Sequence, residues 1–233
     1  MSDLRVALVA EGPTDGVVIE AALRALLPVP FILTVLQPEP TLPRVGGGWC
    51  GVLRWCRAFA ASGHGVLEQD PTLAGFDLFV IHVDADVAEM AYADCGAPAA
   101  ADAEADVVAL PALPCAKPCP PAEDTANEIR DRLRAWLGGA APGPKTVLCV
   151  PSKATEAWLA AAVLEDGHAL LTGLECNLNV EARLASLPKA TRIRKSTQEY
   201  RAWQAQIRAR WHRVRQRCTQ ADRFSTEVAR AVP

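Results

Sequence analysis

The sequence has no long apolar run of the kind that crosses a membrane. Its longest uncharged apolar stretch, residues 25–36, is broken by Pro28 and Pro30 and is shorter than the roughly 20 residues that a membrane-spanning helix requires. The first residues lack the basic region, apolar core and small-residue cleavage site of a secretory signal peptide. We therefore expect no membrane span and a cytoplasmic location.

Three motifs that mark common enzyme classes are also missing. The chain contains no GxSxG nucleophile elbow, no Walker A sequence and no GxGxxG fingerprint, which argues against serine hydrolases, P-loop enzymes and dinucleotide-binding enzymes. The four histidines have no recognisable sequence partners. We expect His82, inside a strand-like run, to be a core residue or to support a ligand rather than to be one.

The eight cysteines do not have the paired two-residue spacings of a zinc ribbon. Cys115 and Cys119 flank a short Ala-Lys-Pro segment, but no second pair follows, so a structural zinc site is not favoured. In a reducing compartment most cysteines should be unpaired, buried and small, as Cys149 in its apolar run is expected to be. We expect no disulfide framework.

What the sequence does contain is an alternation of strand-like and helix-like segments. Apolar runs predict strands at residues 4–10, 31–36, 76–83 and 145–150. After a turn at residues 11–15, helical spacing covers residues 17–26, and further helices are predicted to begin near residues 49, 123 and 152. Residues 88–123 predict an irregular insertion, and helical patterns recur at 180–186, 197–217 and 222–231. The pattern predicts an α/β fold: about four parallel strands flanked by helices, with a C-terminal helical appendage.

The net charge of −3 hides an asymmetry along the chain. Residues 1–180 contain 11 basic and 23 acidic residues, whereas residues 181–233 contain 13 basic and 4 acidic ones. Acidic clusters bind metal ions and basic helices bind phosphates, so this charge distribution raises the possibility of a metal-dependent protein that contacts nucleic acid. A solvated surface is the simpler alternative.

Acidic and polar side chains follow three of the predicted strands. They are Glu11 and Asp15 after the first, Asp84 and Asp86 after the third, and Ser152, Lys153 and Glu156 after the fourth. The carboxyl ends of parallel strands meet at one edge of a sheet, where ligands bind. Five acids therefore converge in the predicted fold.

Crowded carboxylates repel one another unless a cation lies among them. Mg²⁺ or Mn²⁺ fits hard oxygen ligands, and the lack of His or Cys among the residues after these strands argues against zinc. Each acid also has a structural alternative: Asp15 and Glu156 as first-turn helix residues, Asp84 and Asp86 as turn residues. The glycines at 46–48 could approach a phosphate or form a flexible loop.

The segments Glu11-Gly12-Pro13-Thr14-Asp15 and Asp84-Ala85-Asp86, each after a strand, resemble the Toprim domain of topoisomerases, bacterial primases, OLD-family nucleases and recombination mediators. The resemblance covers residues 1–165, which we take as a Toprim-like catalytic domain followed by a basic helical segment, residues 166–233. Asp15 and the segment Pro151–Leu159 make OLD-type nuclease domains and related small bacterial defence-associated proteins the most similar group.

The resemblance implies a site of two divalent ions. Its metal ligands would be Glu11, Asp15, Asp84, Asp86, Ser152 and Glu156, and the catalytic residues would be Glu11, Asp84 and Lys153. Glu11 could alternatively act as a general acid or base. The ATPase domain that precedes Toprim in OLD nucleases is not found in this sequence, so a separate ATPase partner is conceivable. Neither Tyr92 nor Tyr200 is placed for covalent DNA cleavage, which argues against strand passage.

The sequence thus leads to one main hypothesis, a Mg²⁺- or Mn²⁺-dependent nuclease that cleaves DNA or RNA in bacterial defence or repair. A non-catalytic Toprim module that binds nucleic acid or a protein is the alternative, and phosphotransfer to a small nucleotide is a third interpretation. Basic residues between 192 and 217 would contact the nucleic acid, foremost Arg192, Arg194, Lys195, Arg208 and Arg213. A homodimer through this basic face is the competing interpretation.

Overall fold

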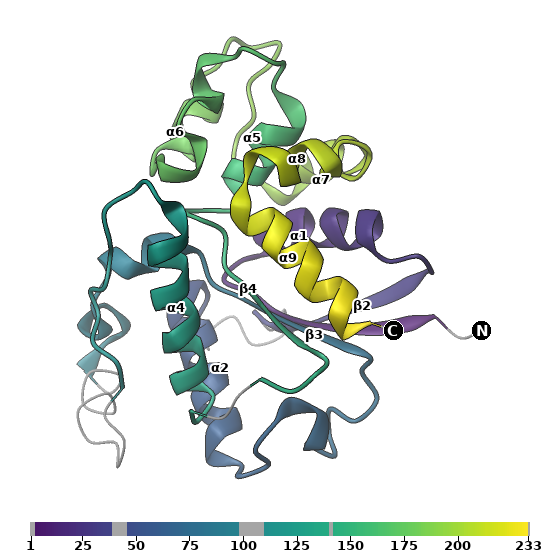
Figure 1. Ribbon diagram of the computed structural model, residues 1–233, viewed down its shortest axis with the longest axis vertical. Helices are drawn as coiled ribbons and strands as arrows, with labels where there is room; N and C mark the ends of the chain where they lie inside the picture. Colours follow the sequence, from purple (N-terminus) through teal and green to yellow (C-terminus); the bar gives the residue numbers. More distant parts are fainter. Residues whose placement is uncertain (1–2, 39–45, 98–109, 140–141, 233) are drawn as a thin grey trace.

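A four-stranded parallel sheet forms the centre of the computed structural model, which describes residues 3–38, 46–97, 110–139 and 142–232. The strands are β1 (Leu4–Val9), β2 (Phe31–Gln37), β3 (Leu78–His82) and β4 (Thr146–Cys149), in the order β2-β1-β3-β4. All three strand pairs are parallel, so every strand ends at the same edge of the sheet (Figure 1). The predicted α/β fold with four parallel strands is confirmed.

Helices connect these strands and continue beyond the last of them. They are α1 (Pro13–Leu26), α2 (Gly48–Ala61), α4 (Ala122–Trp136), α5 (Glu156–Val163), α6 (Val180–Ala185), α7 (Thr197–Ala209), α8 (Trp211–Arg217) and α9 (Thr219–Ala231). The pattern predicted one helix over 197–217, but the chain breaks at Arg210 into α7 and α8. Within the described residues, no helix is both long and apolar enough to cross a membrane.

Alternate residues along each strand serve two separate hydrophobic cores. Val6 and Leu8 of β1 belong to the core on the first face of the sheet, which also contains side chains of α1 and of α5 to α9. Ala7 and Val9 belong to the core on the second face, under α2 and α4. Because successive side chains of a strand point to opposite faces, a sheet buried on both sides reads as a continuous apolar run.

The C-terminal helices complete the first face. Helix α7 packs along α1, and Gln204 of α7 donates to the carbonyl of Val17 over 3.3 Å. The buried Trp158 of α5 lies 5.4 Å from Trp211 and 5.7 Å from Phe224, measured between ring centroids. The basic C-terminal segment therefore contributes apolar side chains to the core as well as surface charge.

The expectation about cysteines was wrong for four of the eight. Disulfide bonds join Cys50 to Cys95 and Cys119 to Cys176, pairs that are 45 and 57 residues apart in sequence. Separations of that length leave no local spacing pattern, so the pairing arises from the fold. Cys149 is unpaired and buried, as predicted.

The described part of the predicted insertion, residues 88–97 and 110–123, contains short 3₁₀ helices and irregular chain. Residues 98–109 lie outside the described residues. Two disulfide bonds are typical of proteins in oxidising compartments, in contrast to the cytoplasmic location that we expected from the sequence.

Candidate metal centre

Loops at the carboxyl edge of the sheet hold the acidic residues in place by backbone hydrogen bonds. Beyond β3, the Asp86 N–H donates to the Lys153 carbonyl over 3.1 Å, which ties the loop after β3 to the loop after β4. After β1, the Glu11 carbonyl accepts the Gly48 N–H over 2.8 Å. Gly48 has a φ of 66°, a backbone conformation that glycine adopts readily. The Gly48 N–H supports Glu11 and is thus not free for a phosphate.

Two overlapping groups of metal-ligand atoms lie at this edge. Glu11, Asp84 and Asp86 offer carboxylate oxygens that lie within 4.8 Å of one another, and so do atoms of Asp15, His82 and Asp84. Asp84 belongs to both groups. The cluster could therefore hold a metal ion, and a shared carboxylate is the arrangement from which a two-ion site is built.

Hydrogen bonds orient the shared ligand, Asp84. Its Oδ1 lies 3.0 Å from His82 Nε2 and accepts the Thr155 N–H over 3.1 Å. The Thr155 hydroxyl donates to Asp15 Oδ1 over 2.6 Å, and the Asp84 N–H donates to Glu11 Oε1 over 2.7 Å. Three segments that are distant in sequence, residues 11–15, residues 82–84 and Thr155, are thus joined at this edge of the sheet.

Burial makes the negative charges of this cluster costly. It raises the pKa of Glu11 well above its usual range, assisted by the charge of Asp84. Burial and the neighbouring Asp15 likewise raise the pKa of Asp84, while burial and Glu156 raise the pKa of Asp86 to about 6. A cation among these groups would favour their ionised forms, so binding of a metal ion would offset the cost of burying their negative charges.

Glu156 lies beside these two groups, in a different environment. The residue is 1% exposed, and its Oε1 accepts the Tyr200 hydroxyl over 2.8 Å and contacts Lys195 Nζ at 3.1 Å. Its Oε2 is buried without a hydrogen-bond partner among the described residues. An uncompensated buried carboxylate oxygen is costly, so Oε2 is the atom of Glu156 that remains available to a ligand.

Lys195, predicted as a contact to nucleic acid, also lies next to the acidic cluster. It pairs with Glu156 and with Glu181, each at 3.1 Å. Although burial opposes its charge, the attraction of Glu156 raises its pKa above the usual range. Lys195 also lowers the pKa of Asp84 and Asp86, which places a positive charge next to the acidic cluster.

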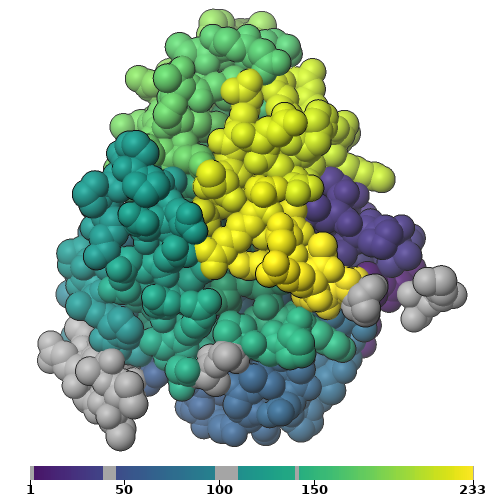
Figure 2. Space-filling view, viewed as in Figure 1, coloured from purple at the N-terminus to yellow at the C-terminus, as the bar shows by residue number. Residues whose placement is uncertain are grey.

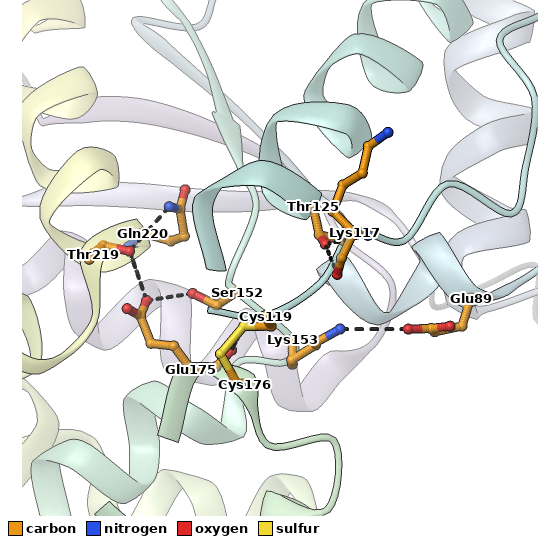
Figure 3. Close-up of a disulfide and its surroundings, with 10 residues drawn as sticks. All are labelled: Glu89, Lys117, Cys119, Thr125, Ser152, Lys153, Glu175, Cys176, Thr219 and Gln220. Carbon is orange, nitrogen blue, oxygen red and sulfur yellow. Dashed lines mark hydrogen bonds and ion pairs between the residues drawn. A yellow bond between two sulfur atoms is a disulfide. The ribbon is translucent and has the colours of Figure 1, made fainter. Parts of the chain in front are cut away.

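Ser152 and Lys153, which were predicted in the site, point in opposite directions (Figure 3). The Ser152 hydroxyl donates to Glu175 Oε1, which also accepts the Thr219 hydroxyl over 3.1 Å. Lys153 is 5% exposed, and its Nζ lies 3.7 Å from Glu89. The Cys119–Cys176 disulfide lies between these two contacts, next to Glu175 (Figure 3).

The other predicted nucleic-acid contacts fall into two kinds. Arg192 and Arg194 line an open hollow of about 260 Å³ beside Trp203, and Arg208 is exposed on α7. Arg213, in contrast, is largely buried: it donates to the Leu164 carbonyl over 2.6 Å and pairs with Asp166 at 2.9 Å. Arg213 is thus already engaged at the C-terminal end of α5.

Sequence reasoning missed two residues of this site, Tyr200 and Thr155. His82 was expected to be a core residue or to support a ligand, and its ring nitrogen does reach Asp84, whereas the helical spacing of Tyr200 gave no sign of its contact with Glu156. Thr155 was overlooked between Lys153 and Glu156. The sequence offered one usable signal for the contact between His82 and Asp84, which is their spacing of two residues. Side chains two residues apart on an extended chain point to the same face.

The comparisons with known proteins give no family assignment. The chain matches no protein-family model, no curated protein and no solved structure. The resemblance to Toprim domains therefore stays a prediction that rests on the motif residues quoted above.

Proposed function

We propose that this chain is a Mg²⁺- or Mn²⁺-dependent nuclease with a Toprim-like core, which hydrolyses phosphodiester bonds of DNA or RNA in bacterial defence or repair. The observation that carries the proposal is the position of Asp84 in two groups of ligand atoms at the carboxyl edge of the sheet. A carboxylate shared in this way can bridge two divalent ions. Two bound ions would supply an activated water and a positive charge next to the leaving oxygen.

The donor set fits such ions. Four carboxylates, from Glu11, Asp15, Asp84 and Asp86, provide the oxygen ligands that Mg²⁺ and Mn²⁺ prefer, and the unpartnered Oε2 of Glu156 lies in the adjacent network. His82 adds a nitrogen ligand, which the sequence analysis did not place in the site. Imidazole also suits Zn²⁺, so the earlier argument against zinc no longer holds and zinc belongs in the experiment.

Two lysines are candidates for stabilising charge on the phosphate. The sequence analysis predicts that Lys153 stabilises this charge, but the Lys153 Nζ lies 3.7 Å from the carboxylate of Glu89. Lys195 is held against Glu156 and acts on the pKa of Asp84 and Asp86. Comparing Lys153→Gln with Lys195→Gln distinguishes them, because only the lysine that contacts the phosphate should lower kcat when metal affinity is unchanged.

The test is cleavage of plasmid DNA and of single-stranded RNA with Mg²⁺, Mn²⁺ or Zn²⁺. Metal-dependent nicking or degradation is expected, with loss of cleavage in Glu11→Gln and Asp84→Asn. Glu165→Gln is the matched control, because the Glu165 side chain is 83% exposed and lies outside the cluster. Cleavage that survives both site substitutions, or that is absent with every metal and substrate, would contradict the proposal.

One observation favours the alternative, a non-catalytic module that binds nucleic acid or a protein. Asp15 and Asp84 already accept hydrogen bonds from Thr155, and these bonds satisfy part of the cluster without any metal. Calorimetric titration distinguishes the two functions. Two-site Mn²⁺ binding supports the nuclease, whereas DNA binding that EDTA does not affect supports the module.

A further inference from the structure

Arg130 of α4 is a buried cation without a counter-charge. The residue is 1% exposed, and none of its three guanidinium nitrogens has a hydrogen-bond partner among the described residues. No carboxylate of the described residues lies within ion-pair distance of it. Burial lowers the pKa of Arg130 to about 10, which still leaves the side chain charged at neutral pH. Burying a charge in this way is expensive unless something else neutralises it.

The residue lines a cavity of about 210 Å³ at the seam between α4 and α9, over the start of the edge strand β4. Figure 2 shows this side of the molecule, with α4 in teal beside α9 in yellow. Arg134, Arg230 and Glu227 also line the cavity. So does Thr146, the first residue of β4. The cavity lies against the edge strand β4, whereas the acidic cluster is built from residues at the ends of β1 and β3, so the two features have different lining residues.

The carboxylate in the cavity wall is already neutralised. Glu227 Oε1 pairs with Arg223 Nε at 2.9 Å, and Arg223 also donates to Asn127. Arg134 pairs with Asp131 on the surface at 2.6 Å. Arg130 and Arg230 therefore provide two positive charges that no carboxylate of the described residues pairs with.

We propose that this cavity binds a phosphate group, with Arg130 at its base and Arg230 and Arg134 at its rim. A guanidinium presents N–H donors in a planar fork that matches phosphate oxygens, and each such hydrogen bond is strengthened by charge. A phosphate group carries more than one negative charge at neutral pH, roughly 1.5 to 2 when it is esterified, which offsets much of the charge of the two unpaired arginines. Bound there, it would join α4 to α9 and satisfy the donors of Arg130. The site is separate from the proposed nuclease centre.

The test is thermal unfolding of the full chain in chloride buffer and in about 10 mM inorganic phosphate at the same ionic strength, since a ligand that binds only the native state raises Tm. Wild-type protein should gain several degrees in phosphate. Arg130→Met should lose this gain, and Arg230→Gln should weaken the apparent affinity roughly tenfold. Arg183→Gln, which removes an exposed arginine of α6 away from the cavity, should respond like wild type.

Measurements with inorganic phosphate, AMP and succinate identify the source of the phosphate. Saturable ³¹P line broadening with inorganic phosphate, but no effect of AMP on Tm, indicates a site for the free ion. Tighter binding of AMP indicates the phosphate of a larger molecule. Equal stabilisation by succinate would overturn the assignment to phosphate.

An unchanged phosphate gain in both Arg130→Met and Arg230→Gln would overturn the site itself, as would no gain in wild type. If Arg130→Met does not fold, the rim variant Arg230→Gln decides alone.

Discussion

The carboxyl edge of the sheet and the cavity near the start of β4 both bury charged side chains, but of opposite sign and with different support. At the carboxyl edge, Asp84 and Asp15 accept hydrogen bonds from neighbouring elements, and yet the carboxylates still repel one another. In the cavity, Arg130 has no protein partner among the described residues. Hydrogen bonds position a buried charge and offset part of the cost of burying it, and a counter-charge offsets more.

The difference teaches how each region would respond to a ligand. The acidic residues are held in place by hydrogen bonds such as that from Thr155 to Asp15, so a metal would enter a cluster that is already arranged. Arg130 has no such restraint, so an anion would supply both its hydrogen bonds and its counter-charge. The predictions below test whether the two regions act independently.

The largest expected effect is on cleavage. Asp84→Asn keeps the shape of the side chain but removes the charge shared by both ligand groups, so metal-dependent cleavage should fall roughly a thousandfold, the equivalent of several kcal/mol. Initial rates of plasmid nicking measure this. The same variant should keep the full phosphate gain in Tm, and a reduced gain would show that the two regions are coupled.

The second effect concerns pH. Because the pKa of Asp86 is about 6 in the folded protein and about 4 when unfolded, the folded state retains a proton that the unfolded state releases between these values. The stability of the metal-free protein should therefore fall as pH rises from about 4 to 7, with Asp86 contributing on the order of 2 to 3 kcal/mol.

Urea unfolding in EDTA, compared between wild type and Asp86→Asn, isolates this contribution. The variant should match wild type near pH 4 and exceed it in stability near pH 7, and added Mn²⁺ should narrow this difference by stabilising wild type more than the variant. A difference that does not change with pH would show that Asp86 is not in the repulsive cluster.

A third, smaller effect should appear at the cavity. In chloride buffer, Arg130→Met removes an uncompensated buried charge and keeps a similar side-chain volume, so it should raise the free energy of unfolding by about 1 kcal/mol. Arg208→Met is the control and should stay within roughly 0.5 kcal/mol of wild type, because Arg208 is exposed. Destabilisation of Arg130→Met alone would mean that a partner already neutralises Arg130.

An effect of similar size concerns the hydrogen bond between Tyr200 and Glu156. Tyr200→Phe removes the hydroxyl and leaves the ring packed, so stability should fall by about 1 kcal/mol. Lys195 still pairs with Glu156 in this variant, and cleavage should therefore fall far less than in Asp84→Asn. Urea unfolding and nicking rates measure the two quantities side by side.

The strands and most helices were predictable because their signals are local. Val6, Leu8 and their neighbours form apolar runs, and acids directly after such runs must lie at the carboxyl edge of a parallel sheet. Glu11, Asp15, Asp84 and Asp86 were therefore found from the sequence, and they do meet. Which additional groups reach them depends on packing.

The unpredicted contacts join segments that are far apart in sequence. Thr155 and Asp15 are 140 residues apart, and Lys195 reaches Glu156 only because α7 packs on α1 and α5. No spacing rule connects such residues. The disulfide partners escaped notice for the same reason, and the direction of Ser152 depends on Glu175, a residue of a distant loop.

The packing of α7 on α1 also has a consequence for how the chain is made. During synthesis α1 emerges before α7, which lies far downstream in the sequence and packs over apolar side chains of α1. Until α7 has emerged, the apolar side chains that it covers stay open to aggregation and to chaperones. Tyr200 lies in α7 and Lys195 shortly before it, so the acidic cluster acquires its final arrangement only after this downstream segment has been synthesised.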